Sequence, residues 1–231
     1  MAYSYPYPRP LVTVDVFLLR LNGPEVEVLL VERKRPPFQG RWALPGGFIE
    51  MDEPLIASAR RELSEETGLR GLPLLELAVF GDPGRDPRDR TVTIVFAGAL
   101  PLDQSPAVAG GDDARQARWF GLSQLPALAF DHGQIVRTCL ERFRFNLIFS
   151  AWWSLFLPAE FSAELPQRVF QAFQLPPWLS TVALHSLTHA GLLVETGGRY
   201  RIQGDVAQFL AQLPSSWWLQ FWLEQLGKTP R

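Results

Sequence analysis

Three glutamates are spaced so that they share one face of a predicted helix. The sequence predicts a helix from Ile56 to Thr67, in which Glu65 and Glu66 follow Glu62 by three and four residues. Like charges at this spacing repel each other, and the helix dipole disfavours anions near the C-terminal end. A divalent cation would remove both costs, and an all-oxygen ligand set suits Mg²⁺ or Mn²⁺. The cluster therefore indicates either a metal site or a solvated acidic face.

The window around these glutamates carries a longer pattern of fixed spacing. It begins at Gly47, reaches Glu53 after five intervening residues, and after seven more continues as Arg61-Glu-Leu-Ser-Glu-Glu-Thr-Gly-Leu69. This matches the box of the Nudix hydrolases, G-x5-E-x7-R-E-U-x-E-E-x-G-U, where U is a bulky aliphatic residue. The chain resembles this family over about residues 9–128. The resemblance implies an α/β fold, an α/β/α sandwich with a mixed sheet, and Mg²⁺-dependent hydrolysis of a nucleoside diphosphate linked to another moiety.

The resemblance also implies which residues hold the metal. Glu62 and Glu66 would be the main ligands, and Glu65 would be a further ligand or the base. Gly46 or Gly47 would let the backbone approach the ion, because a Cβ there would crowd it.

Other positions of the box would support these ligands. Arg61 would hold the glutamates by charge-assisted hydrogen bonds, and Glu53 would brace the loop and Arg61. Asp52 or Glu53 lies near the helix start, where a carboxylate suits the free N–H groups. Gly68 would end the helix as a left-handed cap.

A carboxylate outside the box is a candidate for the general base. Metal ions lower the pKa of a bound water, and a carboxylate then accepts its proton. Asp113 in the Gly-rich loop before residues 117–120 is the first candidate and Asp112 the second, although adjacent aspartates are also typical of turns. No histidine precedes His132, so we expect no histidine base in this domain.

A basic loop between two predicted strands, residues 80–90, points to the substrate. Arginine binds phosphate by bidentate hydrogen bonding. An alternative is a solvated hairpin connection whose Asp and Arg residues pair internally. This loop, segment 35–47 and segment 128–132 are similar to those of ADP-ribose pyrophosphatases and their regulator relatives. The resemblance implies rings that stack an adenine and arginines that hold the diphosphate or terminal ribose: Phe38, Phe80, Arg41, Arg85 and Arg88.

The elements that must position these residues alternate between strand and helix. Helices should therefore pack on the faces of a mixed sheet. Strands are predicted at residues 11–21, 26–32, 72–80, 91–100 and 117–121.

The rest of the chain predicts a second domain. We expect a Nudix domain at 1–128, a linking helix within 129–150, and a mostly helical, winged-helix-like domain at 151–231. The last contains predicted helices at 162–173 and 180–190 and then a Gly-Gly hairpin, the order of a winged helix. Nudix-related transcriptional regulators combine such domains and bind DNA under the control of ADP-ribose.

Charge argues against DNA as the main partner of this domain. The predicted recognition helix, residues 180–190, has no Lys or Arg, and the whole chain has a net charge of −2. Base edges and phosphates are read mainly by cationic and amide side chains. Arg199 and Arg201 are the basic pair of the hairpin, and His185 and His189 are half of a metal site at most.

Aromatic residues gather in the second domain. Trp152 and Trp153 precede Phe156, and Trp217, Trp218, Phe221 and Trp222 recur at helical spacing. Such stripes are typical of a core or of a dimer interface, so we expect packing and homodimerisation to be their role.

Composition excludes several classes for the 231-residue chain. The hydrophobic fraction of 47% excludes global disorder, and the single cysteine, Cys139, excludes a disulfide framework and indicates a buried side chain. The sequence shows no signal peptide and no apolar stretch long enough to span a membrane. We therefore expect a cytoplasmic protein.

The sequence as a whole predicts a Mg²⁺-dependent Nudix hydrolase that cleaves ADP-ribose to AMP and ribose 5-phosphate. Two alternatives stay open. One is an ADP-ribose-responsive transcriptional regulator that binds DNA through the C-terminal domain. The other is a hydrolase that removes oxidised nucleoside triphosphates.

Overall fold

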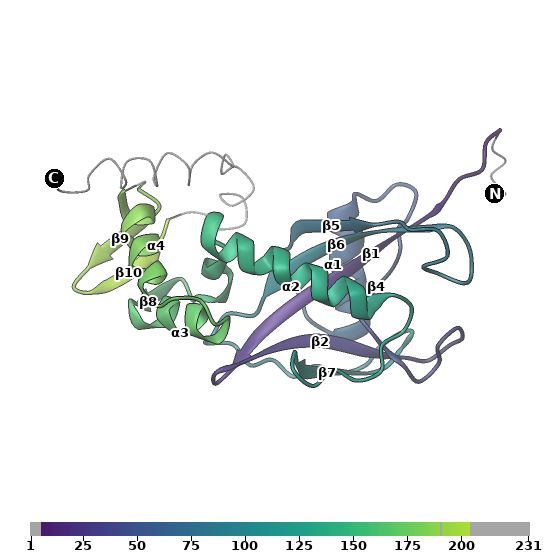
Figure 1. The fold of residues 1–231 in the computed structure, drawn as a ribbon, viewed down its shortest axis with the longest axis horizontal. Helices are drawn as coiled ribbons and strands as arrows, with labels where there is room; N and C mark the ends of the chain where they lie inside the picture. Colours follow the sequence, from purple (N-terminus) through teal and green to yellow (C-terminus); the bar gives the residue numbers. More distant parts are fainter. Residues whose placement is uncertain (1–5, 190, 204–231) are drawn as a thin grey trace. The chain divides into compact units, whose positions relative to one another are not determined.

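A computed structural model describes residues 6–189 and 191–203 of the chain, and they form two compact units (Figure 1). The first unit takes most of the chain up to Cys139. The second takes the chain from Leu140 onward together with the short segments Arg20–Val26 and Ala99–Ser105. The predicted domain limits at 128 and 150 stay a prediction.

A mixed sheet of seven strands forms the first unit. Its strands are β1 (Leu11–Asn22), β2 (Glu25–Arg33), β3 (Trp42–Ala43), β4 (Gly46–Phe48), β5 (Leu75–Phe80), β6 (Thr91–Ala99) and β7 (Ala114–Gly121). The order is β3-β2-β1-β6-β5, with β4 antiparallel to β1 and β7 antiparallel to β2. The strand expected from residue 72 begins only at Leu75.

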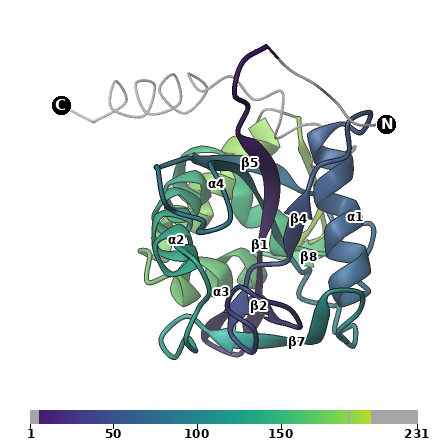
Figure 2. The ribbon, with the colours of Figure 1, turned by 90° about the vertical axis from the view of Figure 1, so that its right-hand side faces the viewer.

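The central strands are buried on both faces, as expected for strands covered by helices. Most of β1 and β2 is buried, including Phe17 and Leu29. Figures 1 and 2 show α1 (Leu55–Thr67) and the start of α2 (His132–Phe149) on opposite sides of this sheet. The predicted α/β/α sandwich is therefore confirmed.

Helix α1 carries the three glutamates and is anchored by its apolar face. Ala59 and Leu63 are buried against the sheet side, and Gly68 ends the helix in the left-handed conformation, with φ 79°. The expected carboxylate cap is wrong, because Pro54 occupies the N-cap position and no side chain caps the helix. Glu53 instead accepts a hydrogen bond from Ser58 Oγ at 2.7 Å.

The second unit contains helices and a small sheet. After α2 come a 3₁₀ helix, η1 (Trp152–Phe156), and then β8 (Glu160–Ser162), α3 (Glu164–Ala172), α4 (Trp178–His189), β9 (Leu193–Thr196) and β10 (Arg199–Ile202). The sheet has the order β8-β10-β9, and Gly197 and Gly198 form the turn of the expected hairpin. The helix predicted at 162–173 begins at Glu164, because Ser162 is still part of β8 and pairs with Arg199 of β10.

Aromatic side chains form the core of this unit. Trp153 and Phe156 are fully buried, and Phe143 contacts Trp152 at 5.3 Å and Phe173 at 5.7 Å between ring centroids. The first aromatic stripe is therefore core. The second stripe, residues 217–222, lies outside the described residues, so homodimerisation stays a prediction.

Two sequence expectations concern single properties of the chain. Cys139 is buried, as predicted. No helix among residues 6–189 and 191–203 is long and apolar enough to cross a membrane.

Candidate functional site

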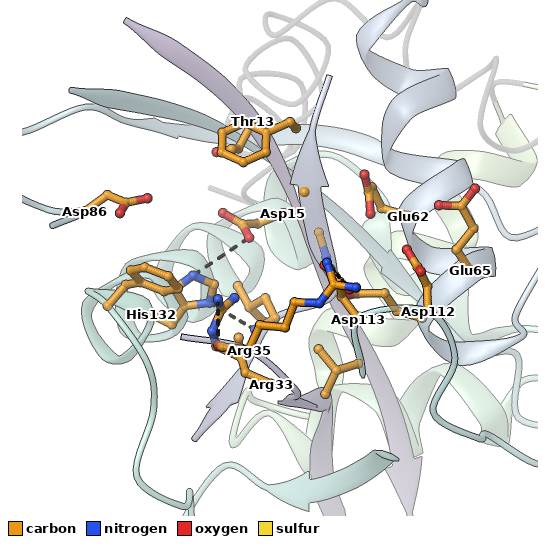
Figure 3. Close-up of a pocket in the computed structure, with 18 of the residues that line it drawn as sticks. Thr13, Asp15, Arg33, Arg35, Glu62, Glu65, Asp86, Asp112, Asp113 and His132 are labelled. Atoms are coloured by element: carbon orange, nitrogen blue, oxygen red, sulfur yellow. Dashed lines mark hydrogen bonds and ion pairs between the residues drawn. The ribbon is translucent and has the colours of Figure 1, made fainter. Parts of the chain in front are cut away.

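A pocket of about 270 Å³ opens in the first unit, and the predicted glutamates form one wall of it. In the view of Figure 3, Glu62 and Glu65 of α1 lie on one side of Asp15 of β1, and Asp86 and His132 lie on the other. The pocket is therefore built from a helix, the central strands and two loops that are distant in sequence.

Arg61 connects the acidic residues of the box. Its Nη1 donates to Glu62 Oε1 at 2.7 Å and to Glu65 Oε2 at 3.3 Å, and its Nε donates to Glu53 Oε2 at 3.1 Å. Its Nη2 also donates to the carbonyl of Phe48 at 3.1 Å, which ties the helix to β4. One guanidinium thus orients three carboxylates and one strand.

Glu66 is the buried member of the glutamate cluster. Its side chain accepts the backbone N–H of Gly46 at 2.9 Å, and the residue is only 7% exposed. Burial raises the pKa of Glu66 to about 8, and the negative charges of Glu62 and Asp15 act in the same direction. A cation bound here would reverse this shift, because it favours the ionised carboxylate.

Glu62 lies directly against the backbone of Gly47. A Cβ on Gly47 would lie 2.5 Å from Glu62 Oε1, and a Cβ on Gly46 would overlap the carbonyl of Val14. Only glycine therefore allows this close approach. Burial also raises the pKa of Glu62, and Arg61 opposes this rise.

The oxygen ligands of the acidic residues suit a hard cation, but their side chains do not converge on one point. Among the described residues no group of three or more His, Cys, Asp or Glu side chains is arranged as a metal site. Glu62 and Glu65 share Arg61 instead. The oxygen donors, the two raised glutamate pKa values and the backbone of Gly47 against Glu62 nevertheless fit a divalent cation.

The loop with the two aspartates also lines the pocket. Lys34 donates from its backbone N–H to the carbonyl of Asp113 at 3.0 Å and from Nζ to the carbonyl of Asp112. Arg35 pairs with Asp113 at 3.4 Å, and the Asp113 side chain is 51% exposed. Asp112 and Asp113 therefore lie on the same side of the pocket as Glu65, because their loop packs against the Glu65 backbone, and Lys34 and Arg35 after β2 hold them there.

A histidine from beyond the predicted limit at residue 128 lines this pocket. His132 lines the pocket although it lies 117 positions after Asp15 in the sequence, because α2 begins beside β1. Its Nδ1 accepts the backbone N–H of Leu44 at 3.0 Å, and its Nε2 lies 3.8 Å from Asp15 Oδ1. Burial lowers the pKa of His132, which favours the neutral ring. With Nδ1 accepting, the proton lies on Nε2, which faces Asp15, so the ring positions backbone and carboxylate.

The arginines of the basic loop have partners within the protein. Arg85 forms a bidentate pair with Asp131, with Nε and Nη2 at 2.9 and 2.8 Å, and its side chain is 6% exposed. Arg88 is bound to Asp86 in the same manner, from Nη2 at 2.6 Å and from Nε at 3.0 Å. Both arginines line the pocket, so internal pairing and a place at the site occur together.

Three residues expected to bind substrate lie elsewhere. Phe38, Arg41 and Phe80 are not part of the lining of this pocket. Two other phenylalanines, Phe48 and Phe130, do line it. Sequence reasoning missed both as binding residues, although Phe48 lies inside the box and Phe130 lies in segment 128–132, which already resembled the ADP-ribose subgroup.

The pocket lies within the part of the chain that matches a known protein family. The NUDIX domain family matches residues 9–143, which is more than half of the chain. This chain belongs to the NUDIX family. The match includes the box, both pocket loops and the first part of α2, so the NUDIX domain supplies every element of the pocket.

Proteins similar to this NUDIX chain include both enzymes and transcriptional regulators. An ADP-ribose pyrophosphatase of Methanocaldococcus jannaschii is 42% identical over 132 residues, which are 57% of this chain and 73% of that protein. The ADPR responsive transcriptional repressor NtrR of Acinetobacter baylyi is 30% identical over 169 residues, 71% of this chain and 67% of that protein. Shewanella oneidensis NrtR, solved in complex with a 27mer DNA, matches with a TM-score of 0.70 and 27% identity over 85% of this chain and 95% of that one.

Proposed function

We propose that this protein is a Mg²⁺-dependent pyrophosphohydrolase that cleaves ADP-ribose to AMP and ribose 5-phosphate. The observation that carries the proposal is the arrangement of the box. Glu62 lies against the bare backbone of Gly47, and Glu66 is buried with its pKa raised to about 8. A buried carboxylate beside others is costly without a cation, so the arrangement supports a metal-dependent enzyme.

Glu62 and Glu66 would hold the ion, with Glu65 as a further ligand, and the glycine backbone at Gly46 and Gly47 leaves room for it. When bound, the ion neutralises charge on the diphosphate and lowers the pKa of a water molecule. Arg61 keeps Glu62 and Glu65 oriented toward the pocket. Because Arg61 bonds both, ion binding requires it to share or release one of them.

Two carboxylates are placed to accept the proton of the attacking water. Glu65 is 44% exposed at the pocket edge, and Asp113 is 51% exposed on the loop beside it. Loss of the base lowers kcat by about 10²- to 10⁴-fold. Loss of a ligand also weakens Mg²⁺ binding, so Glu65→Gln and Asp113→Asn distinguish the two roles when kcat and Mg²⁺ affinity are both measured.

Support for ADP-ribose as substrate comes from the similar pyrophosphatase and from the basic side of the pocket. Arg33 and Arg88 face it together with Lys34, and paired guanidiniums suit a diphosphate. Both arginines pair with an aspartate, but the Arg88 side chain is 35% exposed and that of Arg85 only 6%. We therefore assign the anion contact to Arg88 rather than to Arg85.

A hydrolysis screen tests the proposal. Purified protein with Mg²⁺ is given ADP-ribose, NADH, sugar nucleotides and oxidised nucleoside triphosphates, and products are separated by chromatography. We expect AMP from ADP-ribose as the fastest reaction. Preference for an oxidised triphosphate would favour a hydrolase that removes oxidised nucleotides. No turnover of any of these compounds would overturn the proposal that the protein is an enzyme.

A DNA-binding regulator is the second candidate, and the match to NrtR over 85% of this chain favours it. The second unit has the helix, helix and hairpin order expected of a winged helix. The exposed positions of α4 weaken this candidate, because they hold no Lys or Arg: Trp178, Thr181, His185 and His189. Basic side chains on the hairpin are Arg199 and Arg201, both exposed.

Duplex binding separates the two functions. Fluorescence anisotropy is measured with duplex DNA from upstream of the gene that encodes the protein. The salt concentration is varied between 50 and 200 mM, with and without ADP-ribose. We expect weak binding that does not depend on sequence. Sequence-specific binding at physiological salt, lost on addition of ADP-ribose, would establish the regulator.

A further inference from the structure

We propose that Phe48 and Phe130 are the two walls of a slot that stacks the base of the nucleotide substrate, and that the guanidinium of Arg88 occupies this slot in the free protein. The inference rests on the proposed function, because it names the subsite for the base in the same pocket. It replaces Phe38 and Phe80, which lie outside the pocket lining.

The position of Arg88 between the two residues is the first observation. Its Cζ lies 5.1 Å from the ring centroid of Phe48 and 5.2 Å from that of Phe130. Two aromatic rings 82 positions apart in the sequence thus contact one planar cation. Asp86, itself 6% exposed, holds this guanidinium by a bidentate pair.

Phe48 is exposed where burial would be expected of a phenylalanine in a strand. It is 43% exposed, although it follows Gly47 in β4 and its carbonyl accepts a hydrogen bond from Arg61. A ring fixed by its backbone to the metal-binding loop, but open on one side, is placed to contact a ligand whose phosphates lie at Glu62.

Phe130 is held in an unfavourable backbone conformation. Its φ of 49° is rare for a bulky residue and costs on the order of 1–3 kcal/mol, so surrounding contacts must stabilise it. Those contacts are the ring of Phe38 at 4.8 Å, the ring of His132 at 5.7 Å and the guanidinium of Arg33 at 4.8 Å. The ring of Phe130 is therefore fixed before a ligand arrives.

A purine suits the place that Arg88 occupies. A guanidinium and a purine are both planar and both stack on aromatic faces, and stacking tolerates any base. When a base enters, the guanidinium leaves the rings and becomes available to the diphosphate. The slot therefore couples recognition of the base to release of a phosphate-binding group.

Equilibrium binding of the two reaction products tests the slot without turnover. AMP, ribose 5-phosphate and the fluorescent 1,N⁶-etheno-AMP are titrated into the full chain with Mg²⁺. We expect Phe48→Ala and Phe130→Ala to weaken AMP binding about 5- to 100-fold and to abolish the quenching of etheno-AMP that stacking causes. Affinity for ribose 5-phosphate stays within about twofold, because a sugar phosphate has no base to stack.

Two further variants complete the design. Phe48→Tyr keeps a ring and retains AMP affinity. Phe145→Ala removes a more exposed phenylalanine, 60% exposed and outside the pocket, without effect on AMP binding. The decisive measurement is made on Phe48→Ala, because an exposed side chain can be removed without loss of the fold. Unchanged AMP affinity in Phe48→Ala, or no AMP binding by the unaltered protein, would overturn the slot.

The outcome that would overturn the slot differs from the outcome that would overturn the proposed function. Hydrolysis of ADP-ribose with unchanged AMP affinity in Phe48→Ala leaves the enzyme and removes the slot. Quenching that depends on Phe48, without turnover of ADP-ribose, leaves the slot and removes the enzyme.

Discussion

The backbone N–H of Gly46 donates to Oε2 of Glu66 across 2.9 Å, although twenty residues separate the two positions. This bond docks the C-terminal half of α1 onto β4. It also buries a carboxylate beside Glu62 and Asp15, whose negative charges contribute to its raised pKa. Several consequences of this arrangement can be measured.

Replacing Glu66 should remove activity and keep the fold. The amide oxygen of Glu66→Gln still accepts the Gly46 N–H, but it binds a cation poorly. We expect kcat for AMP release to fall by more than about 100-fold, since even groups that only orient a metal ligand are worth 10- to 100-fold. Glu76→Gln, an exposed glutamate of β5, is the matched control. A Glu66→Gln enzyme with normal kcat contradicts the ligand assignment.

The metal-free protein should lose stability as pH rises. The pKa of Glu66 is about 8 in the folded protein and about 4.5 in an exposed glutamate, so the folded chain holds a proton that the unfolded chain has released between these values. This contribution is complete below pH 4.5 and lost by pH 8, on the order of a few kcal/mol. Urea unfolding in EDTA at pH 5.5 and 8.5 measures it, and Glu66→Gln should lack it. Equal pH dependence in both proteins would show that Glu66 is not the group responsible.

Stabilisation by Mg²⁺ should increase with pH. The ion binds the ionised form of Glu66, so it must displace a proton below about pH 8. We expect the rise in Tm at a fixed Mg²⁺ concentration to be larger at pH 8.5 than at pH 6. Isothermal titration in buffers of different ionisation enthalpy counts the released proton. A Mg²⁺ response that does not vary with pH contradicts this linkage.

A methyl group on Gly47 should displace Glu62. Its Cβ would lie 2.5 Å from Oε1 of this carboxylate, so the side chain must turn away from the loop. We expect Gly47→Ala to weaken Mg²⁺ binding and to lower kcat at least tenfold with little change in secondary structure. Gly133→Ala is the control, because a Cβ there meets only Arg137 Nη1 at 3.8 Å. Intact Mg²⁺ affinity in Gly47→Ala would mean that Glu62 is not a ligand.

Replacing Arg85 should lower the stability of the fold more than it lowers substrate binding. Its guanidinium is paired with Asp131, and both side chains are largely buried. Removing one partner of such a pair leaves a buried charge, so Arg85→Ala should cost about 3 kcal/mol of unfolding free energy. Urea denaturation measures this, with Arg60→Ala on the exposed face of α1 as the control. A stable Arg85→Ala protein with a raised KM would return Arg85 to the substrate.

Local pattern was sufficient for the box and its helix. The spacing of apolar and acidic residues predicted a helix from 56 to 67, and α1 spans Leu55–Thr67 with Gly68 as its left-handed end. These features depend on neighbours within one or two turns, which the sequence shows directly. The same holds for the strands β1, β2 and β6 and for the hairpin at Gly197.

Pairing between distant segments limited the rest. The helix predicted from residue 162 begins only at Glu164, because Ser162 pairs with Arg199 of β10. Arg85 was expected to bind the substrate, but Asp131, 46 positions later, accepts hydrogen bonds from its Nε and Nη2. The local pattern does not identify β10 as the partner of residue 162, or Asp131 as the partner of Arg85. Many other segments and aspartates of the chain would fit equally well.

The sequence by itself determined the family and the helix that carries the three glutamates, because their spacing maps directly onto helical geometry. Only the tertiary structure decided which other groups share their pocket. It brought His132 to Asp15, and Phe130 and Phe48 to Arg88, and it left Phe38 and Phe80 outside the lining. The physical reason is that a side chain's environment depends on how α2 and the loops dock on the sheet, which long-range burial decides.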